Sequence, residues 1–349
     1  MNRRRAGIAT ASVAGAAALV AAGVAAERRL VGRARSAADP YVGVRFGDRH
    51  TAPVTVVAND GVRLHVEVDG DTSSDLTVVF VHGFTLSMAC WHFQRRELAR
   101  DARLVFYDQR SHGASGRSPR EHATIDRLGE DLYDVLQQVA PTGPVVLVGH
   151  SMGGMTVLAL ADRHPELFGE RVAAVALVGT SAGAFAETIF GIPGFVGRAL
   201  RPVAPGAIRV ANRRAQLLEQ GRRAGSDVAF MLTRRLAYGG NPPPSLVAFM
   251  EQMIAGTSVE VMTEFFDTFL DHDKLDALKV LDGVPTLILC GDKDMLTPVK
   301  NSHVMAEALP DAELLVVPGA GHMVMLERPA VVTGACRRLF ERARRASAA

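Results

Sequence analysis

Short, unbroken apolar runs recur along the chain, and each is bounded by glycine or by polar turn residues. Runs of this kind are typical of strands that are buried on both faces of a sheet. They are Leu76–Val81, Arg103–Tyr107, Val145–Val148, Val172–Val178, Thr286–Leu289 and Leu314–Val317. Two earlier segments, Val54–Val57 and Val62–Val68, alternate apolar and polar residues around Asn59-Asp60-Gly61. This alternation predicts a β-hairpin ahead of the buried strands.

Helical patterns separate several of the predicted strands. They cover Ile125–Val139, Met152–Arg163, Val299–Leu309 and Ala330–Arg344. A chain that alternates buried strands with helices forms a mostly parallel sheet with helices on both faces. The sequence therefore predicts an α/β fold.

One interval interrupts this alternation. Between residues 183 and 275 the sequence shows no strand pattern. It has helical stretches instead, at Arg209–Glu219, Asp227–Tyr238, Pro244–Ala255 and Val259–Leu270. We therefore expect a helical insertion at 183–275 that divides an α/β core into two parts, 54–182 and 276–349. A linker at 36–53 joins this core to an N-terminal segment, residues 1–35.

Composition narrows the range of partners. The chain has 349 residues, of which 48% are hydrophobic and 22% charged, as is typical of a globular protein. The net charge is +2, and much of the basic excess lies within residues 1–35, so we expect no nucleic-acid partner. Cys90, Cys290 and Cys336 lie far apart, without the spacing of a metal site or a disulfide framework. We expect them to be reduced and buried, and we expect no metal site.

The N-terminus carries the targeting signal. Arg3, Arg4 and Arg5 precede an uncharged stretch, Ala6–Ala26, long enough as a helix to cross a hydrocarbon core of about 30 Å. The stretch is rich in alanine and glycine and poor in large apolar residues, and Val24-Ala25-Ala26 fits a signal-peptide cleavage site. We predict membrane association through this segment. Export after cleavage and a cytoplasmic protein with an exposed helix are the alternatives.

A candidate nucleophile lies at the end of a predicted strand. Gly149-His150-Ser151-Met152-Gly153 follows the run Val145–Val148 and opens an apolar helix, which is the context of a nucleophile elbow. The glycines allow a sharp turn that presents the Ser151 hydroxyl at the sheet edge. A second match, Gly179-Thr180-Ser181-Ala182-Gly183, leads into the insertion without an immediate helix. We therefore predict Ser151, rather than Ser181, as the nucleophile.

A serine nucleophile needs a base, and the base needs a third group to fix its tautomer. His322 follows the predicted strand Leu314–Val317, and two carboxylates, Asp292 and Asp294, follow Thr286–Leu289. The chain order serine, acid, histidine suits this architecture. The pattern predicts His322 as the base and leaves both aspartates as candidates for the acid.

The tetrahedral intermediate of acyl transfer also needs hydrogen-bond donors for its oxyanion. One natural donor is the backbone N–H of Met152, the residue after the nucleophile. The other must come from a different loop. Because Gly83 lets the backbone approach the site just after Leu76–Val81, we predict the N–H of Phe84.

Together these motifs resemble the α/β-hydrolase superfamily, and within it the cap-bearing serine esterases, monoacylglycerol lipases and perhydrolases. The resemblance runs from Val54 to Arg344 and includes His82-Gly83-Phe84, the elbow and Gly321-His322. The family's acid loop reads Gly-x-x-Asp-x-x-x-Pro. In this chain that loop is Gly291–Pro298, which implies Asp294 as the acid.

The resemblance also extends to the loop Asp108–Gly113. Asp108, Arg110 and His112 are interpreted as scaffolding for this loop and not as catalytic residues. The chain has Ser111 where the family usually has glycine, which leaves the conformation of this loop open.

The resemblance implies hydrolysis of a carboxylic ester, or a related acyl compound, through an acyl-enzyme and without a cofactor. A serine at position 151 argues against the dehalogenases and epoxide hydrolases of the superfamily, which use aspartate. Perhydrolysis and carbon–carbon bond hydrolysis by the same triad remain alternatives, as does a non-catalytic ligand-binding protein. We expect the insertion to form a cap whose phenylalanines and methionines favour a small-molecule acyl substrate with a medium apolar chain.

Overall fold

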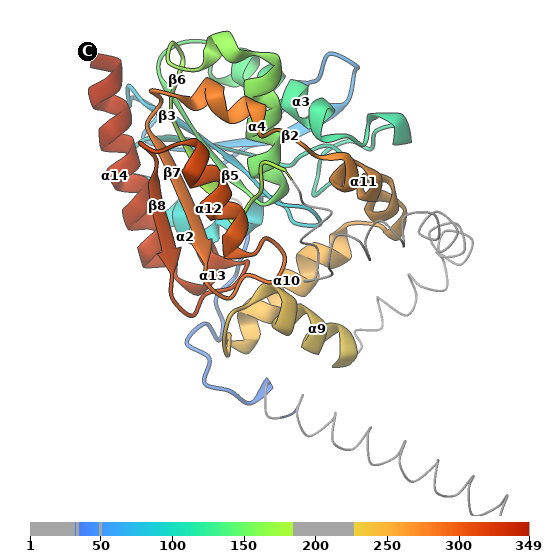
Figure 1. Ribbon diagram of the computed structural model, residues 1–349. Coiled ribbons are helices and arrows are strands. Elements are labelled where there is room, and N and C mark those ends of the chain that lie inside the picture. The colour runs from blue at the N-terminus through green and yellow to red at the C-terminus, as the bar shows by residue number, and fades with distance from the viewer. Residues whose placement is uncertain (1–31, 33–34, 49–50, 184–226, 349) are drawn as a thin grey trace, which may run out of the picture.

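An eight-stranded sheet forms the centre of the computed structural model, which describes residues 32, 35–48, 51–183 and 227–348 (Figure 1). The spatial order of the strands is β1-β2-β4-β3-β5-β6-β7-β8. Their bounds are β1 Val54–Val57, β2 Arg63–Gly70, β3 Thr77–Val81, β4 Arg103–Tyr107, β5 Val145–His150, β6 Val172–Val178, β7 Thr286–Gly291 and β8 Glu313–Val317. Strand β2 pairs antiparallel with β1 and β4, and all other neighbours are parallel. The predicted mostly parallel α/β fold is confirmed.

The predicted hairpin is present at the start of the sheet. Strands β1 and β2 pair antiparallel, with Val57 opposite Arg63. Gly61 adopts a φ of +89° in the connecting turn, a left-handed conformation that glycine tolerates without steric cost. The turn residues Asn59-Asp60-Gly61 thus set the register of the two strands.

Helices cover both faces of the sheet. On one face lie α3 (Ile125–Val139), α4 (Met152–Arg163) and α12 (Val299–Ala308); on the other lie α2 (His92–Glu97), α13 (Val324–Glu327) and α14 (Pro329–Ala348) (Figure 1). Alternate residues of each strand serve the two faces, because successive side chains of a strand point in opposite directions. In β3, Phe80 packs toward α14 and Val79 toward α3 and α4.

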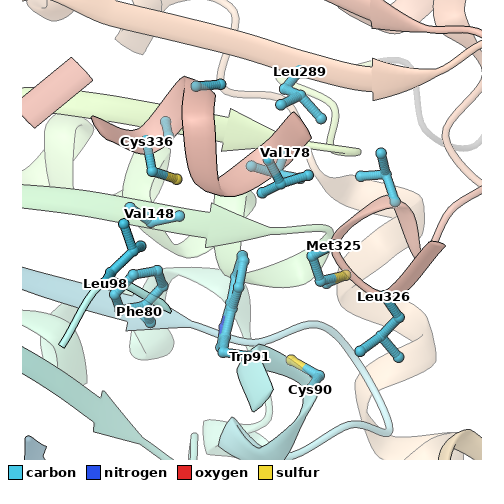
Figure 2. Close-up of a cluster of buried hydrophobic side chains, with 14 of the residues drawn as sticks. Phe80, Cys90, Trp91, Leu98, Val148, Val178, Leu289, Met325, Leu326 and Cys336 are labelled. Atoms are coloured by element: carbon cyan, nitrogen blue, oxygen red, sulfur yellow. The ribbon is translucent and has the colours of Figure 1, made fainter. Parts of the chain in front are cut away.

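The core on the α14 side is built from neighbouring strands and from the helices above them. Figure 2 shows Phe80, Val148, Val178 and Leu289 contributing from β3, β5, β6 and β7, together with Trp91. All of these side chains are fully buried. The three cysteines are free and buried, as predicted. This packed layer fixes the positions at which the strands end.

Between β6 and β7 the described residues form helices and no strand. The α-helices α9 (Asp227–Ala237), α10 (Pro244–Gly256) and α11 (Val259–Asp271) lie together at one side of the molecule, and a short 3₁₀ helix, η5 (Asp276–Leu281), precedes β7 (Figure 1). The predicted helix Arg209–Glu219 lies outside the described residues. The boundaries 183 and 275 of the insertion stay a prediction.

The segment that leads into the sheet packs against the insertion. The ring of Phe46 stacks on that of Phe249 in α10, with 4.8 Å between their centroids. The carboxylate of Asp39 accepts a hydrogen bond of 2.8 Å from the backbone N–H of Ser245. Part of the predicted linker 36–53 is therefore held in place against α10.

The predicted N-terminal anchor, with its apolar stretch 6–26, lies outside the described residues. Within the part of the chain that is described, no helix combines the length and the apolar character needed to cross a bilayer.

Candidate active site

Ser151 occupies a strained turn between β5 and α4. Its backbone angles are φ 53° and ψ −120°, which residues other than glycine rarely adopt. The turn is held by two hydrogen bonds, from the Ser151 N–H to the Val178 carbonyl (2.9 Å) and from the Thr180 hydroxyl to the Ser151 carbonyl (2.7 Å). These bonds hold a partly exposed serine side chain at the end of β5.

Two glycines of the elbow are required because neighbouring backbone leaves no room for a side chain. A β-carbon added to Gly149 would lie 2.5 Å from the carbonyl oxygen of Gly153. One added to Gly153 would lie 2.2 Å from the carbonyl oxygen of Val81, at the end of β3. The motif therefore allows β5, α4 and β3 to meet at one point.

His322 and Asp294 form a buried pair on two neighbouring loops. Asp294 follows β7 and His322 follows β8, and the His322 Nδ1 lies 2.8 Å from the Asp294 Oδ2. An ionised carboxylate only accepts hydrogen bonds, so the proton of this bond belongs to Nδ1. The Nε2 atom of a neutral His322 is then an acceptor, as a general base requires.

The carboxylate of Asp294 is saturated by four donors. Its Oδ1 accepts the backbone N–H groups of Leu296 (2.9 Å) and Thr297 (2.8 Å). Its Oδ2 accepts the Thr297 hydroxyl at 2.8 Å, besides His322. The sequence analysis did not single out Thr297, although a threonine three residues after an aspartate is a recognisable turn signal.

His150 joins the elbow to the His322 loop. Its Nε2 donates to the backbone carbonyl of His322 at 2.9 Å, and the two rings lie 4.7 Å apart. Burial is the main cause that holds the pKa of His150 well below its ordinary value, so the ring is neutral. Gly179, at the end of β6, lies in the same contact region: a β-carbon there would be 3.4 Å from the Asp294 carboxylate.

The three predicted triad residues thus lie at the carboxyl ends of β5, β7 and β8. These strands and β6 are consecutive neighbours in the sheet, and all four run parallel. Ser151 directly follows His150, which touches the His322 loop. Residues that are separated by up to 171 positions in sequence (322 minus 151) are therefore brought to one edge.

The two predicted oxyanion donors flank the same serine. The Met152 N–H lies in the first turn of α4, where amides have no partner within their own helix. The Phe84 turn follows β3, and a β-carbon on Gly83 would lie only 3.0 Å from the Ser151 β-carbon. Thr85, with a φ of +59°, turns the chain sharply after Phe84.

The alternative residues have structural surroundings. The Ser181 hydroxyl is buried and donates to the Gly183 carbonyl at 2.6 Å. The Asp292 carboxylate accepts the backbone N–H of Gly319 at 2.7 Å and so bridges the loops after β7 and β8. In the described part of the chain, neither side chain is hydrogen-bonded to His322 or Asp294.

The loop Asp108–Gly113 has the contacts of a scaffold. The Asp108 carboxylate accepts the backbone N–H groups of Met88 and Ala114, each at 2.8 Å. The fully buried Arg110 is bonded to Asp131 and Asp60. Ser111 adopts a φ of +63°, so the serine takes up the left-handed conformation that glycine would provide.

A cavity of about 570 Å³ lies between the start of α3 and α11. Its lining is rich in carboxylates and includes Asp126, Asp267 and Lys274, but none of the five predicted site residues. It is therefore distinct from the predicted acyl site. The described part of the chain also holds no group of three or more side chains suited to binding a metal ion.

Comparison with known proteins identifies relatives of this architecture. A family model described as the α/β hydrolase fold matches residues 77–329. This range spans the elbow, the acid loop and the His322 loop.

Individual relatives carry several activities in their names. A non-heme haloperoxidase of Rhodococcus erythropolis is 30% identical over 278 residues, which cover 76% of this chain and 92% of the relative. An sn-1-specific diacylglycerol lipase of Mus musculus is 27% identical, over 75% of this chain and 80% of the relative. Among solved structures, a thermophilic esterase from Thermogutta terrifontis matches 84% of this chain and 99% of its own, with a TM-score of 0.65 and 27% identity.

Proposed function

The chain belongs to the α/β-hydrolase fold family, and from this premise we propose that it cleaves carboxylic esters through the triad Ser151, His322 and Asp294. The observation that carries the proposal is the 2.8 Å bond between His322 and Asp294 beside a strained serine elbow. Acyl transfer needs this combination of a nucleophile, a base and a group that orients the base. The esterase and lipase among the similar proteins support an ester as the substrate.

The proposed reaction has two halves. The Ser151 oxygen attacks the ester carbonyl while its proton passes to His322 Nε2, and the carbonyl electron pair moves to oxygen. The tetrahedral intermediate collapses, and the departing alcohol takes that proton. Water then attacks the acyl-enzyme, again with His322 as base, and releases the acid and free Ser151. Asp294 stabilises the imidazolium in both halves.

The proposed oxyanion hole consists of the N–H groups of Met152 and Phe84. The first lies at the positive end of the α4 dipole, which favours a developing negative charge. The second belongs to a turn whose backbone touches the elbow.

We propose that the substrate carries a medium apolar acyl chain. The ring of Phe84 packs on Phe269 of α11 with 5.0 Å between centroids and lies 6.2 Å from Phe265. Both rings belong to a buried apolar cluster with Met152. An apolar wall of insertion side chains therefore begins beside the proposed oxyanion hole and would receive an acyl chain.

A series of p-nitrophenyl esters tests this substrate class. Each buried methylene adds about 0.8 kcal/mol of apolar transfer free energy until the available space is filled. We expect kcat/KM to rise from acetate to about hexanoate and to fall for longer chains. A steady decline from acetate upward would contradict an apolar acyl site.

Perhydrolysis is the second candidate, because a relative named as a haloperoxidase is 30% identical. In that reaction hydrogen peroxide, instead of water, attacks the acyl-enzyme and releases a peracid. Adding hydrogen peroxide to an ester assay and measuring the ratio of peracid to acid separates the two activities. A product mixture dominated by peracid at low peroxide would favour the second candidate.

A further inference from the structure

The loop that carries His322 is held from two sides. On the core side, the Ala320 carbonyl accepts the backbone N–H of Lys293 at 2.9 Å, and the His322 carbonyl accepts His150. On the other side lies the end of α9 and the turn that follows it, residues 237–240, which belong to the helical insertion. The Met323 N–H donates to the Ala237 carbonyl at 2.9 Å.

Glu327 ties this turn to the His322 loop. It is the last residue of α13, and one carboxylate oxygen accepts the N–H of Gly321, directly before His322. The same carboxylate accepts the N–H of Gly239, with distances of 3.0 and 3.2 Å to its two oxygens. One carboxylate therefore bridges two backbone segments that are 82 residues apart (321 minus 239).

The two bridged backbones are in direct contact. A β-carbon on Gly239 would lie 2.5 Å from the carbonyl carbon of Ala320, and one on Gly321 would lie 2.4 Å from the Gly239 nitrogen. The 237–240 turn is also fixed to α10, because the buried Tyr238 hydroxyl donates to the Leu246 carbonyl at 2.8 Å. Direct contacts therefore connect α10, the 237–240 turn and the His322 loop.

We propose that Glu327 is a positioning residue that couples the 237–240 turn of the insertion to His322, so that the insertion sets the geometry of the base. This inference rests on the proposed role of His322 in ester hydrolysis. Partial burial raises the pKa of Glu327, and the backbone amides of Gly321, Gly239 and Gly240 together with the charge of Arg328 oppose that rise. Of the two neighbours of His322, Met323 donates directly to the insertion at Ala237, and Gly321 donates to Glu327, which also binds Gly239 of the insertion.

Adjacent glycines provide a matched pair of variants. Gly239→Ala forces the turn away from Ala320, whereas a β-carbon on the exposed Gly240 meets only the Gly319 oxygen at 3.9 Å. We expect Gly239→Ala to lower kcat on p-nitrophenyl acetate by about 10- to 100-fold, as sub-ångström to 1 Å displacements of catalytic groups do. KM should stay within about twofold, because a shift of the base affects the chemical step more than ground-state binding. Gly240→Ala should retain the wild-type kcat.

Glu327→Gln tests the carboxylate without a change of volume. Glutamine has one acceptor oxygen, and its amide group would face one of the two N–H donors. We expect a similar loss of kcat and a similar slowing of Ser151 labelling by a fluorophosphonate. Because both changes disrupt one bridge, the double variant Gly239→Ala/Glu327→Gln should lose less than the sum of the two free-energy effects. Glu341→Gln, an exposed change on α14, is the control.

Active sites are counted by fluorophosphonate labelling carried to completion, so that kcat refers to folded enzyme even when a variant is less stable. If Gly239→Ala does not fold, Glu327→Gln decides alone. Wild-type kcat and labelling rate in Glu327→Gln, or an equal loss in Gly240→Ala and Gly239→Ala, would overturn the inference. Failure of the wild-type protein to label at all would instead overturn the proposed function.

Discussion

Ser151 and Ser181 both lie between glycines just after a buried strand, yet their hydroxyls have different surroundings. Ser181 is 1% exposed and its hydroxyl is used by a local bond to Gly183. Ser151 has a strained backbone at the start of an apolar helix, with His150 directly before it. The same contrast separates Asp294, which holds His322, from Asp292, which holds Gly319. The local sequence motif is shared, and the next element of the chain distinguishes its two copies.

Buried histidines are a second feature at the residue scale. His82 and His112 are fully enclosed near the sheet edge, and burial lowers their pKa values to about 4 and about 3. Each Nδ1 is bonded to a backbone carbonyl, so each ring is neutral with its proton on Nδ1. At mildly acidic pH these rings are protonated in the unfolded chain but not in the folded protein, so acid lowers the free energy of unfolding.

The His112 ring makes a testable contribution to acid sensitivity. Its pKa is about 3 in the folded protein and about 6.5 in an unfolded chain, so its stabilising effect is complete above pH 6.5 and is lost as the pH falls toward 3. The unfolded state binds one more proton in this range. The free energy of unfolding thereby loses about 1.4 kcal/mol per pH unit.

Glutamine at position 112 cannot bind this proton in the unfolded state, so His112→Gln removes this part of the pH dependence. Urea unfolding at pH 6.5 and pH 5 should show a change in unfolding free energy that is about 2 kcal/mol smaller in His112→Gln than in the wild type. The exposed His303 on α12 provides the control, and His303→Gln should leave the change unaltered. An identical pH dependence in all three proteins would show that His112 is not kept neutral by folding.

At the scale of elements, the sequence pattern predicts the bounds of those helices and strands whose ends are set by their own residues. The ranges predicted for Arg103–Tyr107, Val172–Val178, Ile125–Val139 and Met152–Arg163 coincide with β4, β6, α3 and α4. The two strands are short unbroken apolar runs, α3 has a clear helical period of apolar residues, and α4 is an apolar stretch too long for a strand. The short helices α2 and α13 were not predicted, because they have too few turns to establish a period and depend on packing against Trp91 and α14.

The sequence pattern does not predict which elements that are far apart in the chain contact one another. The order β4-β3-β5, which places β3 beside two later strands, has no local signature. The Gly239–Gly321 contact and its Glu327 bridge join segments that no motif relates. By contrast, the strand ends that present Ser151 and His322 follow from the rule that parallel strands bring their carboxyl ends to one edge.

At the scale of the whole molecule, every proposed site residue lies well beyond residues 1–35. We propose that this N-terminal segment attaches the protein to a membrane. Residues 39 and 46 are held against α10, so a truncation that begins at Arg35 keeps those contacts. Deleting residues 1–34 should move the protein from the membrane fraction to the soluble fraction with unchanged kcat on soluble esters. Equal partitioning of full-length and truncated protein in the native host would exclude the anchor.

The central claim is that Ser151 is an activated nucleophile, and a pair of serine variants tests it most directly. Hydrolysis of p-nitrophenyl esters is measured in wild type, Ser151→Ala and Ser181→Ala, alongside labelling by a fluorophosphonate. We predict that Ser151→Ala loses labelling and about 10⁶-fold in kcat, as the loss of a triad nucleophile does, without a large change in melting temperature. Ser181→Ala should keep a substantial fraction of both signals. A dead Ser181→Ala variant beside an active Ser151→Ala variant would contradict the assignment.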